Sequence, residues 1–130
     1  KQYNVLIGYN EELSHRMYAG ADFLIMPSRV EPCGLNQLYA LRYGTMPLVN
    51  CTGGLKDTII DIEDEEGYGI CFNGATVNNA YLAIARAVEL YQKSTLLTLL
   101  RKRMMALDFS WDKSAKEYID LYKSLTTSNL

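Results

Sequence analysis

The sequence predicts an α/β fold with three layers, in which helices cover both faces of a mostly parallel sheet. Two observations predict it. Short apolar runs near residues 22–26, 47–50 and 69–72 alternate with longer stretches of helical periodicity. Loops containing glycine and proline follow the first two runs, as they do at the carboxyl ends of parallel strands. Ligands bind at that edge of such a sheet, so a site is expected there.

Composition limits the functions that remain open. With 130 residues the chain forms at most one domain, and 48% hydrophobic with 22% charged residues is ordinary for a globular protein. A formal net charge of −2 gives no basic surface for nucleic acid or an anionic membrane. No apolar run reaches the roughly 18 residues of a membrane span. We therefore expect neither nucleic acid nor a membrane as a partner.

The three cysteines predict reduced thiols. Cys33, Cys51 and Cys71 are odd in number and too widely spaced for a paired Cys-x-x-Cys motif. They favour a cytoplasmic protein with no disulfide and no metal site. The chain starts at Lys1, directly before an apparent strand, so we expect it to be a piece of a larger protein.

The first elements are predicted to be a strand, a helix and a second strand. Residues 3–9, YNVLIGY, have the composition of a strand. Asn10 predicts the N-cap of a helix that runs to about Ala19 and ends at Gly20. The apolar segment Ala21–Met26 predicts a short strand buried on both faces.

The next segment predicts a loop and a helix. Pro27 and Pro32 bracket a non-helical loop, because proline lacks a backbone donor and restricts the residue before it. Gly34 allows a tight turn and the close approach of a ligand. About ten helical residues follow from Leu35, and Gly44 lies where a C-terminal helix cap belongs.

A second glycine loop and an acidic loop follow. The strand at 47–50 leads into a glycine turn at 52–54, and a short helix is expected at Thr58–Asp61. The acidic run Glu63–Glu66 predicts a solvated, mobile loop rather than a metal site, because its spacing is not that of a ligand loop. The strand at 69–72 completes the predicted sheet.

Three helices are predicted after the last strand. They are expected at Thr76–Gln92, from Ser94 to about Leu107, and from about 110 to 126. Helical periodicity predicts an inward-facing stripe on the first of them, formed by Ile84, Ala87, Val88 and Tyr91.

The first loop has chemistry that suits a phosphorylated sugar. Backbone N–H groups near Gly34, Leu35 and Asn36 would point out of a helix N-terminus and favour an anion such as phosphate. The carboxylate of Glu31 only accepts hydrogen bonds, so it suits the hydroxyl groups of a sugar. Spacing alone also fits, and favours, an ordinary strand-to-helix turn with a solvent-facing Glu31.

The residues of this stretch resemble one family closely. The run PSRVEPCGLNQLY at 27–39, followed by YGTMPLV at 43–49 and TGGLKDT at 52–58, resembles the bacterial glycogen synthase and plant starch synthase family. The segments IGY at 7–9, SHR at 14–16 and DFSW at 108–111 extend the resemblance over nearly the whole chain.

The resemblance implies a place for the chain in a larger fold. The family has two Rossmann-like domains arranged as in GT-B glycosyltransferases. Residues 1–130 would form the C-terminal part of the nucleotide-sugar-binding domain, with further strands before Lys1 and a terminal helix at about 110–126. In the family this terminal helix packs toward the N-terminal domain, which would be a partner missing from this chain.

The resemblance also implies roles in a donor site. Tyr9 would stack on the nucleotide base. Glu31, the candidate catalytic residue, would bind hydroxyl groups of the donor glucose, and Cys33 and Gly34 would line the sugar pocket through their backbone.

Further donor contacts are implied for both loops. Leu35 and Asn36 would give backbone amides to the distal phosphate. Thr52, Gly53 and Gly54 would bring their backbone close to the donor sugar or to the acceptor. No metal ligand is implied.

Tyr39 separates this sequence from related enzymes. Many glycosyltransferases of the same architecture, such as sucrose and trehalose-phosphate synthases, carry a second glutamate at this position, where it holds the ribose. The glycogen and starch synthases differ there too, so Tyr39 favours the narrower assignment. Asn36 is a smaller departure, since threonine is expected. The single histidine, His15, has no base partner beside it and suits a structural role.

The implied function is the elongation of an α-1,4-glucan. The whole enzyme would transfer glucose from ADP-glucose or UDP-glucose to a non-reducing end with retention of configuration, without a cofactor. An arginine and a lysine that stabilise the departing diphosphate would lie before Lys1, so the isolated chain is expected to be inactive. The alternative is a non-catalytic nucleotide-binding or interaction module.

Overall fold

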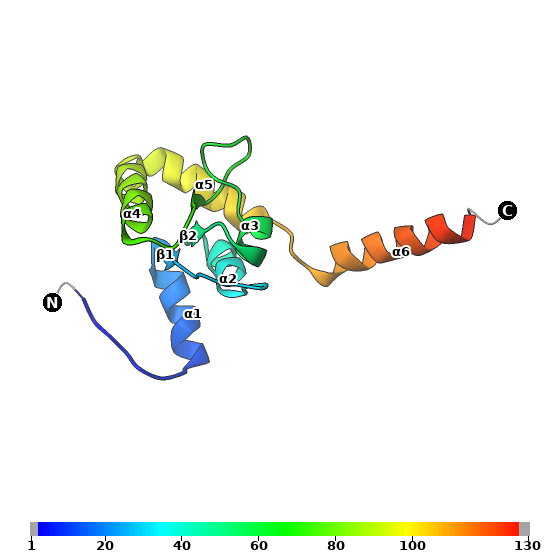
Figure 1. Ribbon diagram of the computed structural model, residues 1–130, viewed down its shortest axis with the longest axis horizontal. Coiled ribbons are helices and arrows are strands. Elements are labelled where there is room, and N and C mark those ends of the chain that lie inside the picture. The colour runs from blue at the N-terminus through cyan, green and yellow to red at the C-terminus, as the bar shows by residue number, and fades with distance from the viewer. Residues whose placement is uncertain (1–2, 128–130) are drawn as a thin grey trace.

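The computed structural model describes residues 3–127 (Figure 1). The helices and strands are, in chain order, α1 (Glu11–Gly20), β1 (Phe23–Met26), α2 (Asn36–Tyr43), β2 (Met46–Asn50), α3 (Gly53–Thr58), β3 (Ile70–Phe72), α4 (Val77–Gln92), α5 (Ser94–Ala106) and α6 (Trp111–Thr127).

Three parallel strands form the sheet, in the order β1-β2-β3. Ile25 lies opposite Leu48, and Leu48 lies opposite Ile70, so these side chains share one face of the sheet. All five residues of the central strand β2 are buried, as expected of a parallel strand with helices on both sides. The predicted α/β fold with a parallel sheet is confirmed.

Helices cover both faces of this sheet. Figure 1 shows the strands between α2 and α4, and α5 contacts both of these helices. The largest fully buried apolar side chains come from the sheet and from α2, α3 and α5: Leu41, Met46, Pro47, Val49, Leu55, Ile70 and Met104.

The helix ends follow the local chemistry of the sequence. The Asn10 side chain accepts a hydrogen bond from the N–H of Leu13 at 2.9 Å and so caps α1. Thr76 caps α4 in the same way. Gly44 ends α2 with a φ of 75°, the left-handed conformation that glycine adopts at low cost. The predicted caps at Asn10 and Gly44 are confirmed, and the helix predicted at Thr76–Gln92 begins one residue later, with Thr76 as its N-cap.

The predicted inward stripe of α4 is only partly correct. Ala87 is buried as predicted, but Ile84, Val88 and Tyr91 are 45–56% exposed. The helix instead buries Ala83 and Leu90. The exposed side chains lie beside β1, the outer strand of the sheet, where no further strand among the described residues covers them.

An open apolar groove results beside β1. It has a volume of about 350 Å³ and is lined by Phe23, Ile25, Leu48, Ile84, Ala87, Val88 and Tyr91. Because β1 is the outer strand on this side, its outer backbone edge pairs with no other strand of the part of the chain that the structure describes.

The predicted strand at 3–9 is wrong for this structure. The segment forms no strand, and its side chains are exposed, Ile7 almost completely at 99%. It runs away from the sheet in Figure 1. A strand needs a neighbour for its backbone groups and a surface for its apolar side chains, and this segment has neither among the described residues.

The short helix predicted at Thr58–Asp61 is also wrong. Helix α3 begins five residues earlier, at the glycine turn, and ends at Thr58. The backbone is extended at Ile59, which ends the helix, and the Ile59 side chain is buried in the core. Asp61 then pairs with Gly69 in an isolated bridge at the start of the last strand.

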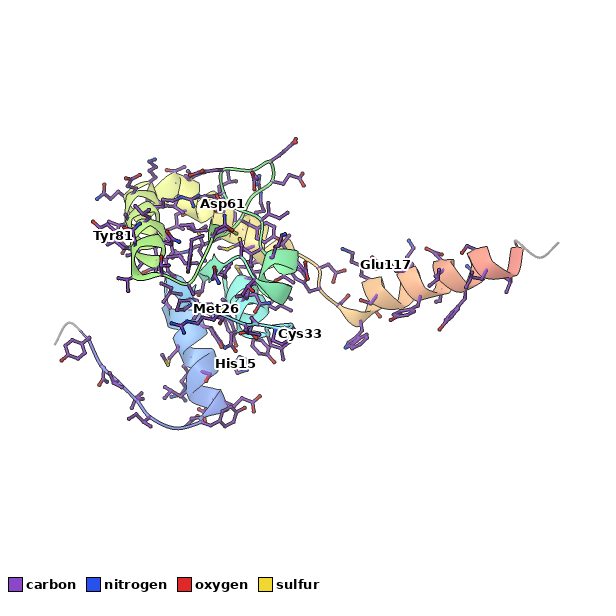
Figure 2. The ribbon with its side chains drawn as sticks, viewed as in Figure 1. His15, Met26, Cys33, Asp61, Tyr81 and Glu117 are labelled. Carbon is purple, nitrogen blue, oxygen red and sulfur yellow. The ribbon has the colours of Figure 1, made fainter. Side chains whose placement is uncertain are left out.

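Helix α6 projects from the rest of the molecule. Figure 1 shows it leading away from the sheet, and its side chains, Glu117 among them, extend into solvent (Figure 2). Trp111 at its start is 84% exposed. Within residues 3–127 no helix has the length and apolar character needed to cross a membrane.

Candidate functional site

The two predicted ligand loops meet at the carboxyl ends of β1 and β2. Residues 27–35 follow β1, and residues 51–54 follow β2. The N–H of Gly54 donates to the carbonyl of Glu31 at 3.0 Å, which joins the loops directly. The structure thus brings Glu31, Cys33 and Gly34 of the first loop together with the second glycine loop.

The glycines of the second loop are required by this crossing. A Cβ atom at Gly53 would lie 2.0 Å from the carbonyl oxygen of Glu31, and one at Gly54 would lie 2.0 Å from that of Cys33. Contacts this short with backbone atoms leave no room for a side chain. The predicted close approach at Gly53 and Gly54 is therefore an approach of one loop to the other; their contact with a ligand stays a prediction.

Glu31 is half-buried at the start of the crossing. The hydroxyl of Ser28 donates to its Oε2 at 3.2 Å, which leaves the other carboxylate oxygen without a protein hydrogen bond among the described residues. A carboxylate held in this way can still accept hydrogen bonds from a ligand hydroxyl.

The N-terminus of α2 is open. Its N-cap residue, Leu35, makes no capping hydrogen bond and is 61% exposed. Among the described residues no acceptor faces the N–H groups of Gly34, Leu35 or Asn36. These donors lie beside the loop crossing and can bind an anion there.

Two buried amide side chains support the loops, and the sequence analysis missed both. Asn50, 5% exposed, donates to the carbonyl of Ser28 at 2.8 Å and accepts from the N–H of Gly74 at 2.8 Å. Gln37, 0% exposed, donates to carbonyl oxygens of the first loop. The sequence offered one signal for these supports, which is that Asn50 is a polar residue at the end of a buried strand.

Tyr9 is not brought into the site. It lies in the unpaired segment at 3–9 and is 90% exposed. Its role in stacking on a base stays a prediction.

Tyr39 belongs to an aromatic cluster between α1 and α2. Its ring lies edge-on to His15 at a centroid distance of 5.2 Å and close to Tyr18 at 6.0 Å. The Nδ1 atom of His15 is 3.2 Å from the hydroxyl of Tyr43. Burial, with a smaller contribution from Tyr39, raises the pKa of Tyr18. These contacts agree with a structural role for His15.

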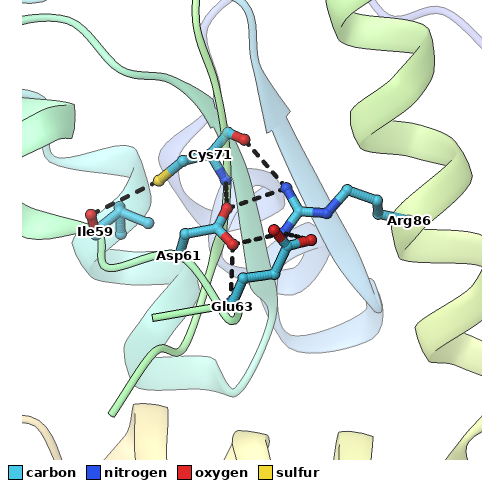
Figure 3. A network of polar contacts seen from close by, with 5 residues as sticks. All are labelled: Ile59, Asp61, Glu63, Cys71 and Arg86. Carbon is cyan, nitrogen blue, oxygen red and sulfur yellow. Dashed lines mark hydrogen bonds and ion pairs between the residues drawn. The ribbon is translucent and has the colours of Figure 1, made fainter. Parts of the chain in front are cut away.

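An ion-pair network joins Arg86 of α4 to Asp61 and to Glu63 at the start of the acidic loop (Figure 3). Arg86 of α4 contacts the Asp61 carboxylate at 2.5 and 3.1 Å and Glu63 at 3.0 Å. Partial burial acts to raise the pKa of Asp61, but hydrogen bonds from Arg86, Cys71 N–H and Glu63 N–H outweigh it and lower that pKa. Glu63, at the start of the predicted mobile loop, is therefore held by an ion pair.

Known proteins with similar sequences include bacterial glycogen synthases. The chain is 55% identical over 120 residues to the glycogen synthase of Flavobacterium johnsoniae, covering 92% of this chain and 25% of that protein. It is 48% identical over 123 residues to that of Bacillus anthracis, covering 93% and 26%. The chain thus spans about a quarter of the length of these relatives. Models of protein families give no match.

Solved structures similar to this chain include a starch synthase and a sucrose-phosphate synthase. The catalytic domain of starch synthase IV from Arabidopsis thaliana, bound to ADP and acarbose, matches 92% of this chain and 25% of its own, with a TM-score of 0.81 and 40% identity. A sucrose-phosphate synthase from Thermosynechococcus elongatus matches less well, with a TM-score of 0.59 and 30% identity over 85% of this chain and 27% of its own.

Proposed function

We propose, on the premise that the chain belongs to the glycogen synthase and starch synthase family, that it supplies part of a donor site for glucan elongation. The full-length protein would transfer glucose from a nucleoside diphosphate glucose to the non-reducing end of an α-1,4-glucan with retention of configuration. The observation that carries the proposal is the crossing of the two loops beside the open N-terminus of α2.

Each part of the crossing suits one part of the donor. The free N–H groups of Leu35 and Asn36 would bind the distal phosphate, because a helix N-terminus favours an anion. Glu31 would bind glucose hydroxyls with its unengaged oxygen. The backbone of Cys33 and Gly34, and of the second loop at 52–54, would complete the sugar pocket.

ADP-glucose is the proposed donor. The support is the starch synthase of similar structure, which was solved with ADP. The acceptor would be an α-glucan. A cytoplasmic location belongs to the same proposal and is supported by three free cysteines.

Residues 1–130 are proposed to be the C-terminal part of the nucleotide-sugar-binding domain. The unpaired edge of β1 and the apolar groove beside it support further strands contributed by the rest of the protein. The exposed apolar side chains of α6, from Trp111 to Leu125, support a contact with another domain of the same protein, which we propose is the N-terminal one. Basic residues that stabilise the departing diphosphate would also come from outside this chain.

The proposal is tested by calorimetric titration of the full-length protein with ADP, UDP and ADP-glucose, together with an assay of glucan extension. Glu31→Ala is expected to weaken ADP-glucose by roughly 1.5–3 kcal/mol, the value of a hydrogen bond to a charged group, and to leave ADP unchanged. The isolated chain is expected to extend no glucan.

Each result has a clear meaning. Binding of neither nucleotide would reject the donor site, and nucleotide binding without glucan extension by the full-length protein would leave a non-catalytic nucleotide-binding module. Equal loss of ADP and ADP-glucose in Glu31→Ala would reject the role of Glu31 toward the sugar.

A further inference from the structure

Gln37 is the most completely buried polar side chain near the loop crossing. It is 0% exposed, and its Nε2 atom lies 3.2 Å from the carbonyl oxygen of Cys33, 3.0 Å from that of Gly34 and 3.1 Å from the hydroxyl oxygen of Thr58. Its Oε1 atom is buried and has no hydrogen-bond partner. Leaving such an atom unpaired is unfavourable, so the three contacts on the nitrogen side hold the side chain in place.

The chemistry of its neighbours fixes which end of the amide faces them. Two of the three are backbone carbonyls, and the third, the Thr58 hydroxyl, already donates its proton to the Gly54 carbonyl at 2.6 Å. All three are therefore acceptors, and only the –NH₂ end of Gln37 can donate to them, with its two N–H bonds shared among the three.

The two carbonyls that Gln37 holds belong to the two peptide units that carry the N–H groups of Gly34 and Leu35, in the proposed sugar pocket and phosphate site. In a trans peptide the C=O and the N–H point in opposite directions. The Cys33 carbonyl shares its peptide unit with the Gly34 N–H, and the Gly34 carbonyl shares its unit with the Leu35 N–H. By drawing both carbonyls inward, Gln37 turns both N–H groups outward, where no protein acceptor among the described residues meets them.

Gly34 is adapted to this contact. Its φ is 73°, and a Cβ atom there would lie 2.5 Å from Oε1 of Gln37. Through Thr58, the same amide is linked to the Gly54 carbonyl in the second loop. Gln37 is thus connected to both loops of the crossing, directly to the first and through Thr58 to the second.

We propose that Gln37 is a positioning residue that aims the N–H group of Leu35 at the distal phosphate of the donor nucleotide and the N–H group of Gly34 at the adjoining sugar pocket. The inference rests on the proposed function, because that function supplies the nucleotide. Gln37 itself touches no substrate in this account. It acts by fixing two peptide planes before the ligand arrives, as in other sites built from successive backbone N–H groups.

The test compares ADP with AMP in the full-length protein. AMP lacks the distal phosphate, so a defect in positioning weakens ADP and spares AMP. Gln37→Glu keeps the shape and replaces the donor with a carboxylate that repels both carbonyls, and Gln37→Met keeps the length without a donor. Both are expected to weaken ADP about tenfold or more and to leave the dissociation constant of AMP unchanged.

Thr45→Val is the matched control. Thr45 is also a buried polar residue, 1% exposed, whose hydroxyl contacts the carbonyls of Tyr18 and Ala21 at the opposite edge of the sheet. Its replacement is expected to lower the melting temperature and to leave the ratio of ADP to AMP affinity as in the wild type.

The outcomes separate the inference from the function on which it rests. Absence of ADP binding by the wild-type protein would reject the proposed function. Wild-type binding with an unchanged ratio of ADP to AMP affinity in both Gln37 variants would overturn the inference alone. Failure of both variants to fold, or parallel loss of ADP and AMP, would assign Gln37 to stability and overturn it as well.

Discussion

Replacing Gly54 with alanine tests whether the crossing of the two loops depends on that glycine. A Cβ atom at Gly54 would lie 2.0 Å from the Cys33 carbonyl oxygen, where ordinary contacts begin at 3.4 Å, so one loop must move by about 1.4 Å. Overpacking of this kind costs about 1–3 kcal/mol. The movement also stretches the hydrogen bond from Gly54 N–H to the Glu31 carbonyl, which adds about 0.5–1.5 kcal/mol.

One effect opposes this cost. Gly54 lies in α3 without a positive φ, so alanine gains up to about 1 kcal/mol of helix propensity there. The balance is a net destabilisation of about 1–3 kcal/mol. We expect a lower melting temperature of the full-length protein together with weaker ADP-glucose binding, since the loop that moves carries Cys33 and Gly34.

Gly20→Ala is the matched control for this substitution. Gly20 also lies in a helix without a positive φ, and no atom lies within 4 Å of the position its Cβ would take. Its replacement is expected to leave stability unchanged or slightly increased. Equal melting temperatures and equal donor affinity for Gly54→Ala and wild type would refute the reasoning from the loop contact.

Two further perturbations address the supports around the site. Asn50→Ala removes hydrogen bonds to Ser28 and Gly74, so we expect a loss of about 1–3 kcal/mol of stability. We also expect the affinity for ADP-glucose to fall more than the affinity for ADP. An equal loss of affinity for both ligands in titration would contradict this expectation. Because the pKa of Asp61 is lowered in the folded state, its ion pair with Arg86 stabilises at neutral pH, and this is lost as pH falls through the folded pKa. Asp61→Asn should therefore lower the melting temperature at pH 7 and flatten its decline below about pH 4; parallel wild-type and variant profiles would rule this out.

The fold was predictable where short-range chemistry decides it. Asn10 and Gly44 mark helix ends by their own side chain or lack of one, and β2 is apolar from Met46 to Val49 because helices cover both faces of the sheet. The segment at 3–9 has strand composition, but a strand also needs a partner, and none is available within residues 3–127. Composition alone contains no information on that partner.

Helix α4 shows a second limit. It carries apolar residues on more than one face, and periodicity selected the face of Ile84 and Val88. The structure buries the neighbouring face of Ala83, Ala87 and Leu90, on which the two small alanine side chains allow the helix to approach the sheet. A sequence pattern cannot show which of two apolar faces meets the core when the other meets an open edge.

Some features of the candidate site were predictable from the sequence, and others were not. The glycines at 34, 53 and 54 were predictable as positions of close approach, because only glycine tolerates them. That the approach at Gly53 and Gly54 is between two loops follows only from their placement in space. Gln37 and Asn50 were missed because an amide side chain in a helix or at a strand end is ordinary until its burial is known.

The free edge of β1 has a consequence for handling the chain by itself. Its four residues, FLIM, present unpaired backbone groups next to an apolar groove, which is the arrangement that recruits a strand from another molecule. At high concentration the separated chain should therefore self-associate through Phe23–Met26. A charged residue at the exposed Ile25 would discourage that pairing and keep the chain monomeric.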